Sequence, residues 1–454
     1  MRDIEVAIIG GGPAGLSTAL FLAHQRPDLT GRIAVLERER YPRDKYCAGA
    51  LGARADKLLA GIGVEVSVPS VPIHGMSAAF QRGGIVLREP GIGRVVRRIE
   101  FDRALALAAR ARGISVLEGA GVASVAWGPE GRGAVLETEG GPVRARVVVG
   151  ADGVGSVVRR AMGLPFGRIR AQVAEVDTEP VGRDDPAREL LHFDLSHRNF
   201  PGYAWDFPTL AGGERLVCRG VYVLTTPSAL DRSPKNTRTQ SAPDADVKEI
   251  LRVHLRSLGL DLDRYRVKRF AERGYDPSIE LSRPGALLAG EAAGIDPMLG
   301  EGIPQAIEYG ALAGRYLADE FARGDFTFRD WTDHVRASRL GRDLRVRAAF
   351  LERYYEGFKA KPQANTKTNN TTNTDTNTNT KTSLRDPIER YVLTGPAFLR
   401  VGLRYFGGKP IGRADRLRAL ASAALFAPQI GLGAIAREVA RAAVAPLARF
   451  ARPR

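Results

Sequence analysis

The segment from Ile4 to Glu37 constrains the fold more than any other part of the chain. A short apolar run, Ile4 to Ile9, stops at Gly10-Gly11-Gly12-Pro13-Ala14-Gly15. The three glycines at fingerprint spacing have separate functions: Gly10 makes a tight turn, Gly12 lets backbone amides approach a pyrophosphate, and Gly15 lets helix and strand pack closely. This pattern predicts a helix N-terminus directed at negative charge.

A helix and a second strand complete this unit. The helix is expected from Leu16 to about His24, and Ile33 to Leu36 forms a strand that ends at Glu37. An acid at this distance from the last glycine can accept hydrogen bonds from a ribose hydroxyl. We therefore predict a dinucleotide site rather than an ordinary βαβ turn. The motif alone does not separate FAD from NAD.

Charge and cysteine content limit the remaining classes. The chain has 454 residues, with 67 basic against 51 acidic ones and a formal charge of +16. Such a charge suggests nucleic acid or an anionic membrane, but arginine is scattered along the whole chain without a zinc spacing or an RNA-binding signature, so we predict no nucleic-acid partner. Two cysteines and no signal-peptide hydrophobic region predict a reducing, cytoplasmic location.

Two later strands also run into glycine turns. Val147 to Val149 leads into Gly150-Ala151-Asp152-Gly153, where backbone and a carboxylate could meet a cofactor; the alternative is an Asp-Gly turn that ends in a helix cap. Ala286 to Ala289 leads into Gly290-Glu291 and then Gly300-Glu301-Gly302-Ile303, before a helix from Pro304 to Phe321. This is the third corner that could face a cofactor.

The three corners, in this order and spacing, resemble the FAD-binding domain of the para-hydroxybenzoate hydroxylase-like flavoprotein superfamily. The resemblance implies that the first turn holds the FAD pyrophosphate, that the Asp-Gly turn supports it, and that the late turn meets the ribityl chain and phosphate. Arg98, in an R-x-x-F-D pattern, matches an arginine that contacts FAD. Glu291 stands where the family usually has aspartate. The residues assigned to FAD are Gly10, Gly12, Ala14, Gly15, Glu37, Ala48, Gly49, Arg98, Val122, Asp152, Glu291, Gly302 and Ile303.

Two further segments resemble the geranylgeranyl reductase family within that superfamily. Asp44-Lys45-x-Cys47 matches a loop that places a cysteine near the flavin, and Gly202-Tyr203-Ala204-Trp205-Asp206-Phe207-Pro208 matches its Y-x-W-x-F-P signature. Alternation places the three rings on one side of a strand, where they could be core or could line a slot for a long apolar chain. We favour the slot. Cys47 could equally be a small buried hydrophobe, but its loop next to the cofactor turn favours the active site.

The resemblance implies FAD-dependent reduction of carbon–carbon double bonds in a polyprenyl lipid or quinone. Cys47, Tyr203 or an ordered water is the candidate proton donor, and Trp205 completes the catalytic set. The electron donor is left open between NADPH and a ferredoxin-type carrier, because no second dinucleotide fingerprint is present. The basic surface would suit an acidic electron-transfer protein.

Three rival functions are considered: two other enzyme activities of the same superfamily and one role without catalysis. A hydroxylase of an aromatic or polyketide-like substrate shares the superfamily. A halogenase needs an early lysine, but there is none between Lys57 and Lys235, and its W-x-W-x-I-P signature is replaced here. A membrane-associated flavoprotein electron carrier would bind FAD without turning over a small substrate.

The predicted fold class is α/β, with a discontinuous Rossmann-type FAD-binding domain, an α+β substrate domain and a helical C-terminal region. The expected boundaries are 1–72, 98–163 and 280–324 for the FAD-binding domain, 73–97 and 164–279 for the substrate domain, 325–361 for a helical extension, 362–386 for a disordered Asn/Thr linker and 387–454 for a basic apolar helical tail. The tail lacks charge from Ala419 to Ala436, so either an interfacial helix pair on the inner face of the membrane or a helix packed on the protein's own surface is expected.

Overall fold

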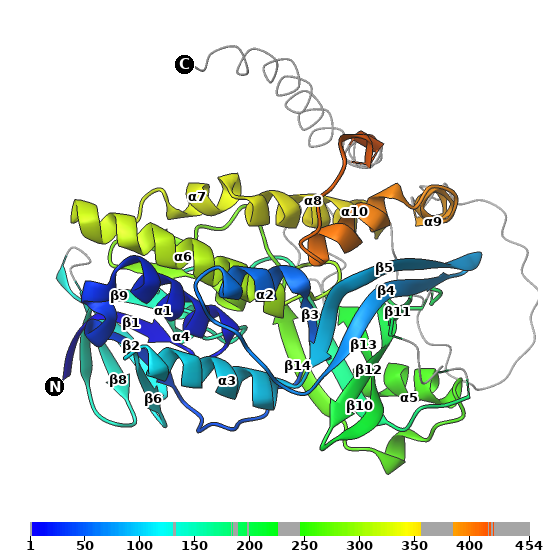
Figure 1. Cartoon of the computed structure of the whole chain (residues 1–454), viewed down its shortest axis with the longest axis horizontal. Helices are drawn as coiled ribbons and strands as arrows, with labels where there is room; N and C mark the ends of the chain where they lie inside the picture. Colours follow the sequence, from blue (N-terminus) through cyan, green and yellow to red (C-terminus); the bar gives the residue numbers. More distant parts are fainter. Residues whose placement is uncertain are drawn as a thin grey trace, which may run out of the picture.

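The computed structural model describes residues 2–129, 133–182, 184, 189–197, 199–225, 246–355, 385–415, 417–418 and 421. Two sheets form the body of the molecule and lie side by side in Figure 1, with a row of helices along one side of both.

The first sheet has a parallel centre and contains the N-terminal unit. Its main path runs β15-β16-β9-β1-β2-β6, and β7 and β8 form an antiparallel extension from β9. Because β9 pairs in parallel with both β1 and β16, the ends of three strands far apart in sequence meet at one edge. The strands are β1 (Arg2–Ile9), β2 (Ile33–Glu37), β6 (Ser115–Glu118), β7 (Val122–Trp127), β8 (Ala134–Thr138), β9 (Val143–Gly150), β15 (Ser282–Arg283) and β16 (Ala286–Leu288).

Helices α1 (Pro13–Gln25), α3 (Arg98–Ala111) and α6 (Ile303–Arg323) pack against this sheet and one another. Two glycines of α6 make its close approach to α1 possible. A Cβ at Gly310 would lie 2.4 Å from the Cβ of Ser17, and one at Gly314 would lie 2.6 Å from that of Phe21. The helix that follows the first glycine turn is therefore locked against the helix that follows the last.

The second sheet is curled and mostly antiparallel, in the order β14-β10-β13-β12-β11-β4-β5-β3. Its one parallel pair joins β11 to β4. The strands are β3 (Ala50–Gly52), β4 (Ser70–Phe80), β5 (Gly83–Val96), β10 (Arg170–Thr178), β11 (Leu191–Asp194), β12 (Gly202–Ala211), β13 (Glu214–Leu224) and β14 (Lys268–Arg273).

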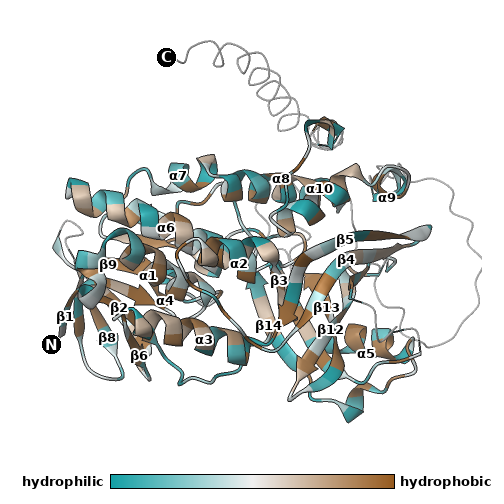
Figure 2. Cartoon of the chain, viewed as in Figure 1, coloured by the Kyte–Doolittle hydropathy of each residue, from teal (hydrophilic) through white to brown (hydrophobic). Residues whose placement is uncertain are grey.

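The two faces of this sheet carry separate apolar clusters. One packs against α5 (Val247–Arg256), and the other joins the aromatic strand β12 to α8 (Arg339–Tyr354), α9 (Arg385–Thr394) and α10 (Ala397–Phe406). The remaining helices are α2 (Ala53–Ala60), α4 (Val157–Ala161) and α7 (Trp331–Ala337). In Figure 2 the visible side of α7 and α8 is largely hydrophilic, whereas β12 and β13 are largely hydrophobic.

The predicted α/β class is confirmed: a mixed sheet carries the dinucleotide-type unit, and a curled half-barrel sheet stands beside it. Most of the predicted linker, 362–384, lies outside the described residues, and Arg385 and Asp386 already belong to α9. Apart from residue 421, the uncharged stretch 419–436 is also outside them. Among the helices of the described residues, none is long and apolar enough to cross a membrane.

Candidate functional site

The three glycine corners meet at the carboxyl edge of the first sheet. A Cβ at Gly10, whose φ is +104°, would lie 2.4 Å from the carbonyl oxygen of Ala151 in the second corner. One at Gly290, with φ +61°, would lie 2.5 Å from the Cβ of Ala14 in the first. A Cβ at Gly153, whose φ is +75°, would lie 3.5 Å from the Glu291 carboxylate, an ordinary contact between the second and third corners. The corners are thus in mutual contact, and glycine is required where they touch.

Gly12 and Gly15 differ in what surrounds them. A Cβ at Gly15 would lie 2.0 Å from the Gly10 carbonyl oxygen, so this glycine serves helix–strand packing. At Gly12 only an Arg98 nitrogen comes within range, at 3.6 Å. Gly12 is the N-cap residue of α1, and no side chain of the described residues accepts hydrogen bonds from the first amides of the helix. The turn therefore presents free backbone amides and a helix N-terminus to an anion, beside an arginine.

Glu37 is held by a network that the sequence only partly predicted. Its carboxylate accepts hydrogen bonds from the Gly11 amide at 2.8 Å and from the Glu39 amide at 3.0 Å. Arg43 lies 3.2 Å from Glu37 and 2.9 Å from Asp102, and Asp102 also pairs with Arg98 at 2.7 Å. Sequence reasoning missed Arg43, although its place in the loop after the acid is a usable signal.

The Asp-Gly turn leaves one carboxylate oxygen without a partner. Asp152 Oδ2 accepts the Val157 amide at 2.6 Å, which caps α4, whereas Oδ1 is buried and has no hydrogen-bond partner among the described residues. Burial raises the pKa of Asp152 and of Glu291. A hydroxyl-bearing ligand at this turn would supply the donor that Asp152 Oδ1 lacks, so the residues present fit an FAD ribityl chain.

Val122, another residue predicted to contact FAD, begins β7 and lies half-buried. The strand start is near Glu37, because the Ala120 amide donates to the Glu37 carbonyl oxygen at 2.8 Å. Val122 therefore follows two residues after the point where the chain contacts Glu37, and it lies outside the cavity wall described below.

A cavity of about 1140 Å³ opens beside the corners and runs under α8 and α10. It is mainly apolar, and most of the charged side chains in its wall come from α8. Predicted site residues in its wall are Cys47, Ala48, Gly49, Tyr203, Trp205, Gly302 and Ile303. The other predicted residues, Gly10, Gly12, Ala14, Gly15, Glu37, Arg98, Val122, Asp152 and Glu291, lie outside this wall.

The aromatic wall of the cavity is a packed surface. Tyr203, Trp205 and Phe207 point to the same side of β12 and are buried. Tyr203 stacks on Tyr222 with ring centroids 5.2 Å apart and an interplanar angle of 17°, and its hydroxyl donates to the Leu299 carbonyl oxygen. Burial raises the pKa of Tyr203 well above its usual value, so the hydroxyl keeps its proton at neutral pH.

Cys47 lies where the cavity meets the corners. Its Sγ accepts the Gly49 amide at 3.4 Å, and burial raises the thiol pKa despite the opposing charge of Arg98. Behind the loop, Glu175 accepts the Cys47 amide at 3.0 Å. Burial raises the pKa of Glu175 to about 7. Cys47 is therefore a neutral thiol, suited to donate a proton rather than to attack as a thiolate.

Sequence reasoning missed Glu272, a carboxyl group in the cavity wall. Its Oε2 is buried and has no hydrogen-bond partner among the described residues. Burial, together with the nearby charge of Glu291, raises its pKa well above the usual value. Alternation along β14 could have suggested an inward side chain, but only the tertiary structure places it beside Tyr203 and Cys47.

The C-terminal helices were also missed as part of the site. Phe398, Leu399, Leu403 and Phe406 of α10 close the cavity opposite the aromatic wall. Tyr405 lies beneath Arg54, whose guanidinium carbon is 3.9 Å from the ring centroid. The cavity therefore requires residues beyond 324, where the motif-based resemblance ends.

Together, the fold and the geometry define a two-sheet flavoprotein in which a dinucleotide-binding edge adjoins a deep apolar cavity. The sequence matches the FAD binding domain family over residues 3–325, and the chain belongs to that family. It is an FAD-dependent oxidoreductase similar to geranylgeranyl reductases.

Relatives and solved structures agree with this class. A digeranylgeranylglycerophospholipid reductase of Methanopyrus kandleri is 29% identical over 338 residues, which cover 71% of this chain and 82% of the relative. A menaquinone reductase of Mycolicibacterium smegmatis is 26% identical over 340 residues, covering 69% and 76%. A geranylgeranyl bacteriochlorophyll reductase-like protein of Thermoplasma acidophilum shares the fold at 20% identity, with a TM-score of 0.64 over 78% of this chain and 88% of that chain.

A flavin-dependent brominase shares the fold over more of the chain. It is 18% identical, with a TM-score of 0.63, and the match covers 90% of this chain and 94% of the brominase. At this identity the likeness concerns the fold alone.

Proposed function

We propose that this protein reduces carbon–carbon double bonds in a polyprenyl lipid or quinone. The observation that carries the proposal is the long apolar cavity of about 1140 Å³, which adjoins the dinucleotide-binding edge at Cys47 and at Gly302–Ile303. Small-molecule sites span roughly 300–1,000 Å³, so this cavity has room for an extended apolar chain beside a flavin ring. The relatives named for digeranylgeranyl lipid and menaquinone reduction support the same class of substrate.

Bound FAD would supply hydride chemistry at its N5 position. The residues that would hold it are the three corners, with Arg98 beside the Gly12 turn and Asp152 and Glu291 facing the ribityl chain. The aromatic wall of Tyr203, Trp205 and Phe207 would hold the chain of the substrate flat. The mainly apolar lining would leave few polar groups to hold water beside the double bond.

Addition of hydrogen across a double bond also needs a proton. The Cys47 thiol lies at the junction of cavity and corners and is neutral because burial raises its pKa. We propose Cys47 as the proton donor and the two aromatic residues Tyr203 and Trp205 as positioning groups. The Tyr203 hydroxyl already donates to Leu299, so it is a weaker candidate than the thiol.

The cavity wall at α8 favours an anionic head group on the substrate. Arg342 and Arg345 line the cavity there, and neither forms an ion pair with the carboxylates of the described residues. Arg347, by contrast, is neutralised by Asp296, Asp343 and Glu301. We therefore propose a phosphorylated polyprenyl lipid ahead of a quinone. The electron donor would act transiently on bound FAD, and NADPH and a ferredoxin-type carrier both remain proposals.

The test is a single turnover without oxygen. FAD-loaded protein is reduced, mixed with geranylgeranyl lipids that carry or lack a phosphate, and followed by flavin absorbance and product mass. We expect the flavin to become oxidised while the product gains two hydrogens for each bond reduced. Flavin that stays reduced with unchanged lipid mass would overturn the proposal, and oxygen uptake tied to an aromatic substrate would favour a hydroxylase instead.

The two cysteines provide a matched pair of variants. Cys47→Ala removes a thiol from the cavity wall. Cys218→Ala removes a thiol that is fully buried in the protein and does not line the cavity. Loss of a general acid slows a reaction by about 10²–10⁴-fold, so Cys47→Ala should slow flavin oxidation by substrate to that extent. Cys218→Ala should leave the rate within a few-fold of the parent, and both variants should bind FAD.

A further inference from the structure

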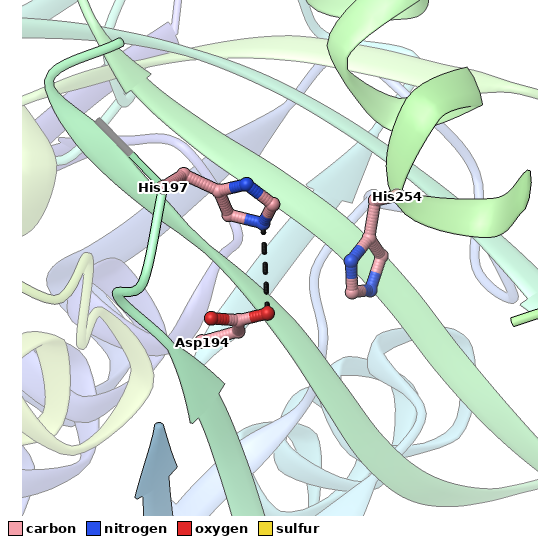
Figure 3. A group of neighbouring side chains, drawn as sticks. All are labelled: Asp194, His197 and His254. Atoms are coloured by element: carbon pink, nitrogen blue, oxygen red, sulfur yellow. Dashed lines mark ion pairs between the residues drawn. The ribbon is translucent and has the colours of Figure 1, made fainter. Parts of the chain in front are cut away.

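We propose that Asp194, His197 and His254 form a binding site for a divalent transition-metal ion of the zinc type, on the side of the second sheet that faces away from the cavity. Figure 3 shows the three side chains converging from β11, from the loop that follows it and from α5. One ligand atom from each residue lies within 4.8 Å of the others.

Strand alternation separates this cluster from the substrate cavity. Phe193 of β11 lines the cavity, so the next residue, Asp194, points to the opposite face. Trp205 and Phe207 of β12 likewise line the cavity, and Asp206 between them points away. The cluster therefore lies behind the aromatic wall, between the sheet and α5.

The distance between Asp194 and His197 fits two ligands of one ion better than a hydrogen bond. His197 Nε2 lies 3.5 Å from Asp194 Oδ2, and this nitrogen is buried without a hydrogen-bond partner among the described residues. Two ligands at about 2.0–2.1 Å from a tetrahedral zinc ion are about 3.3 Å apart. The third ligand atom, on His254, lies within 4.8 Å of the other two, so metal binding would draw the three side chains closer together.

Two of the three ligands, His254 and Asp194, are oriented by a partner that occupies the other polar atom of the side chain. His254 Nε2 lies 3.2 Å from Asp206 Oδ1, which leaves Nδ1 facing the other two residues in Figure 3. Asp206 is itself paired with Arg219 at 2.9 Å. The backbone amide and hydroxyl of Ser196 both donate to Asp194 Oδ1, at 2.9 and 2.6 Å, and leave Oδ2 to the cluster. Carboxylate–histidine pairs of this kind orient metal ligands and fix the imidazole tautomer.

Two histidines and one carboxylate leave a coordination position for water, as in three-ligand zinc sites. Arg219 neutralises Asp206, and Arg385 donates to the carbonyl oxygen of His197 rather than to its ring. The Asp194 carboxylate therefore supplies the negative charge that faces the ion. Bound metal would tie α5 to β11, and so would brace the strands that carry the aromatic wall.

The experiment uses the full chain with FAD bound and without a polyhistidine tag. Protein is stripped with a chelator, incubated with ZnSO₄, desalted, and assayed for metal content and for Tm. We expect one zinc per chain and a Tm several degrees above that of the stripped protein. Co²⁺ should give tetrahedral absorption bands at wavelengths longer than the flavin spectrum, which adventitious surface binding would not give.

Variants identify the ligands. His197→Gln and Asp194→Asn should each weaken zinc binding at least tenfold, because each removes a ligand atom. His24→Gln changes an exposed histidine at the end of α1 and should bind zinc as the parent does. Zinc content well below one per chain, or equal zinc binding by the parent and His197→Gln, would overturn the proposal. Neither outcome bears on lipid reduction.

Discussion

At the scale of single residues, two carboxyl groups in and around the cavity have pKa values that burial raises above the usual range for glutamate. Glu175 is fully buried behind the Cys47 loop, and Glu272 lies in the cavity wall with one unpartnered oxygen. Burial raises the pKa of both. Glu175 should therefore affect the stability of the fold, and Glu272 is a second candidate proton donor in the cavity wall.

For Glu175, a folded-state pKa raised to about 7 means that the native protein binds this proton more tightly than the unfolded chain does. The stabilisation is fully present below the unfolded pKa and is lost as pH rises towards about 7, by up to about 3 kcal/mol. Glu175→Gln should match the parent near pH 4 and be more stable than it near pH 8. Thermal unfolding of both proteins across this range checks the sign. A constant difference in Tm would contradict it.

Glu272 lies in the same cavity wall as Cys47. A neutral carboxyl group is in general a stronger acid than a thiol. Because Cys47 is the proposed proton donor, Glu272→Gln should slow single-turnover reduction only a few-fold and leave substrate affinity unchanged. A slowing of Glu272→Gln by about 10²–10⁴-fold, with a far smaller effect of Cys47→Ala, would assign the proton to Glu272 instead. A solvent deuterium isotope effect in the parent shows whether the proton step limits the rate.

At the scale of elements, the aromatic wall depends on a glycine in the neighbouring strand. Gly220 of β13 lies directly opposite Trp205 in the antiparallel pair β12–β13. A Cβ at Gly220 would lie 2.1 Å from an indole carbon of Trp205. The indole can lie flat on the sheet only because this position has no side chain.

Gly220→Ala should therefore displace the Trp205 ring into the cavity. Overpacking of this kind costs about 1–3 kcal/mol, so we expect a lower Tm together with a weaker affinity for long-chain lipid. Gly31→Ala is the matched control, because a Cβ there would meet nothing within 4 Å. Intrinsic fluorescence and lipid titration measure the two effects. Unchanged lipid affinity in Gly220→Ala would argue against a substrate on this wall.

The same elements show how far sequence reasoning reaches. The pattern around Gly10, the alternation of Tyr203, Trp205 and Phe207, and the strand before Gly290 are local, and they predicted the α/β class and the strands that carry these residues. Alternation could place Glu272 on the inner side of its strand, but the roles of Glu272 and Gly220 come from neighbours in other strands and have no local signal. Long-range register is set by the whole sheet and cannot be read from one segment.

At the scale of the whole molecule, the C-terminal helices close the cavity although no motif connects them with the flavin site. Arg385 at the start of α9 is 3% exposed, lies 3.0 Å from Glu389, and donates to the carbonyl oxygens of Leu195 and His197. Tyr354 of α8 donates to the same Glu389 at 2.8 Å. The Arg385–Glu389 pair lies within α9, and the hydrogen bonds from Arg385 to the two carbonyl oxygens attach α9, and with it α10, to the segment that follows β11.

Arg385→Ala should weaken the attachment of α9 and α10 and so open the cavity that α10 covers. Removing one partner of a buried pair costs about 3–5 kcal/mol, because the other charge remains buried. We expect faster amide hydrogen exchange in 385–411 than in the parent, with no change in 4–37, and faster oxidation of reduced flavin by oxygen, since α10 covers the cavity. Arg400→Ala, at an exposed position of α10, is the control. If exchange in α10 stays at the parent rate while Tm falls, Arg385 stabilises the fold without holding the cavity closed.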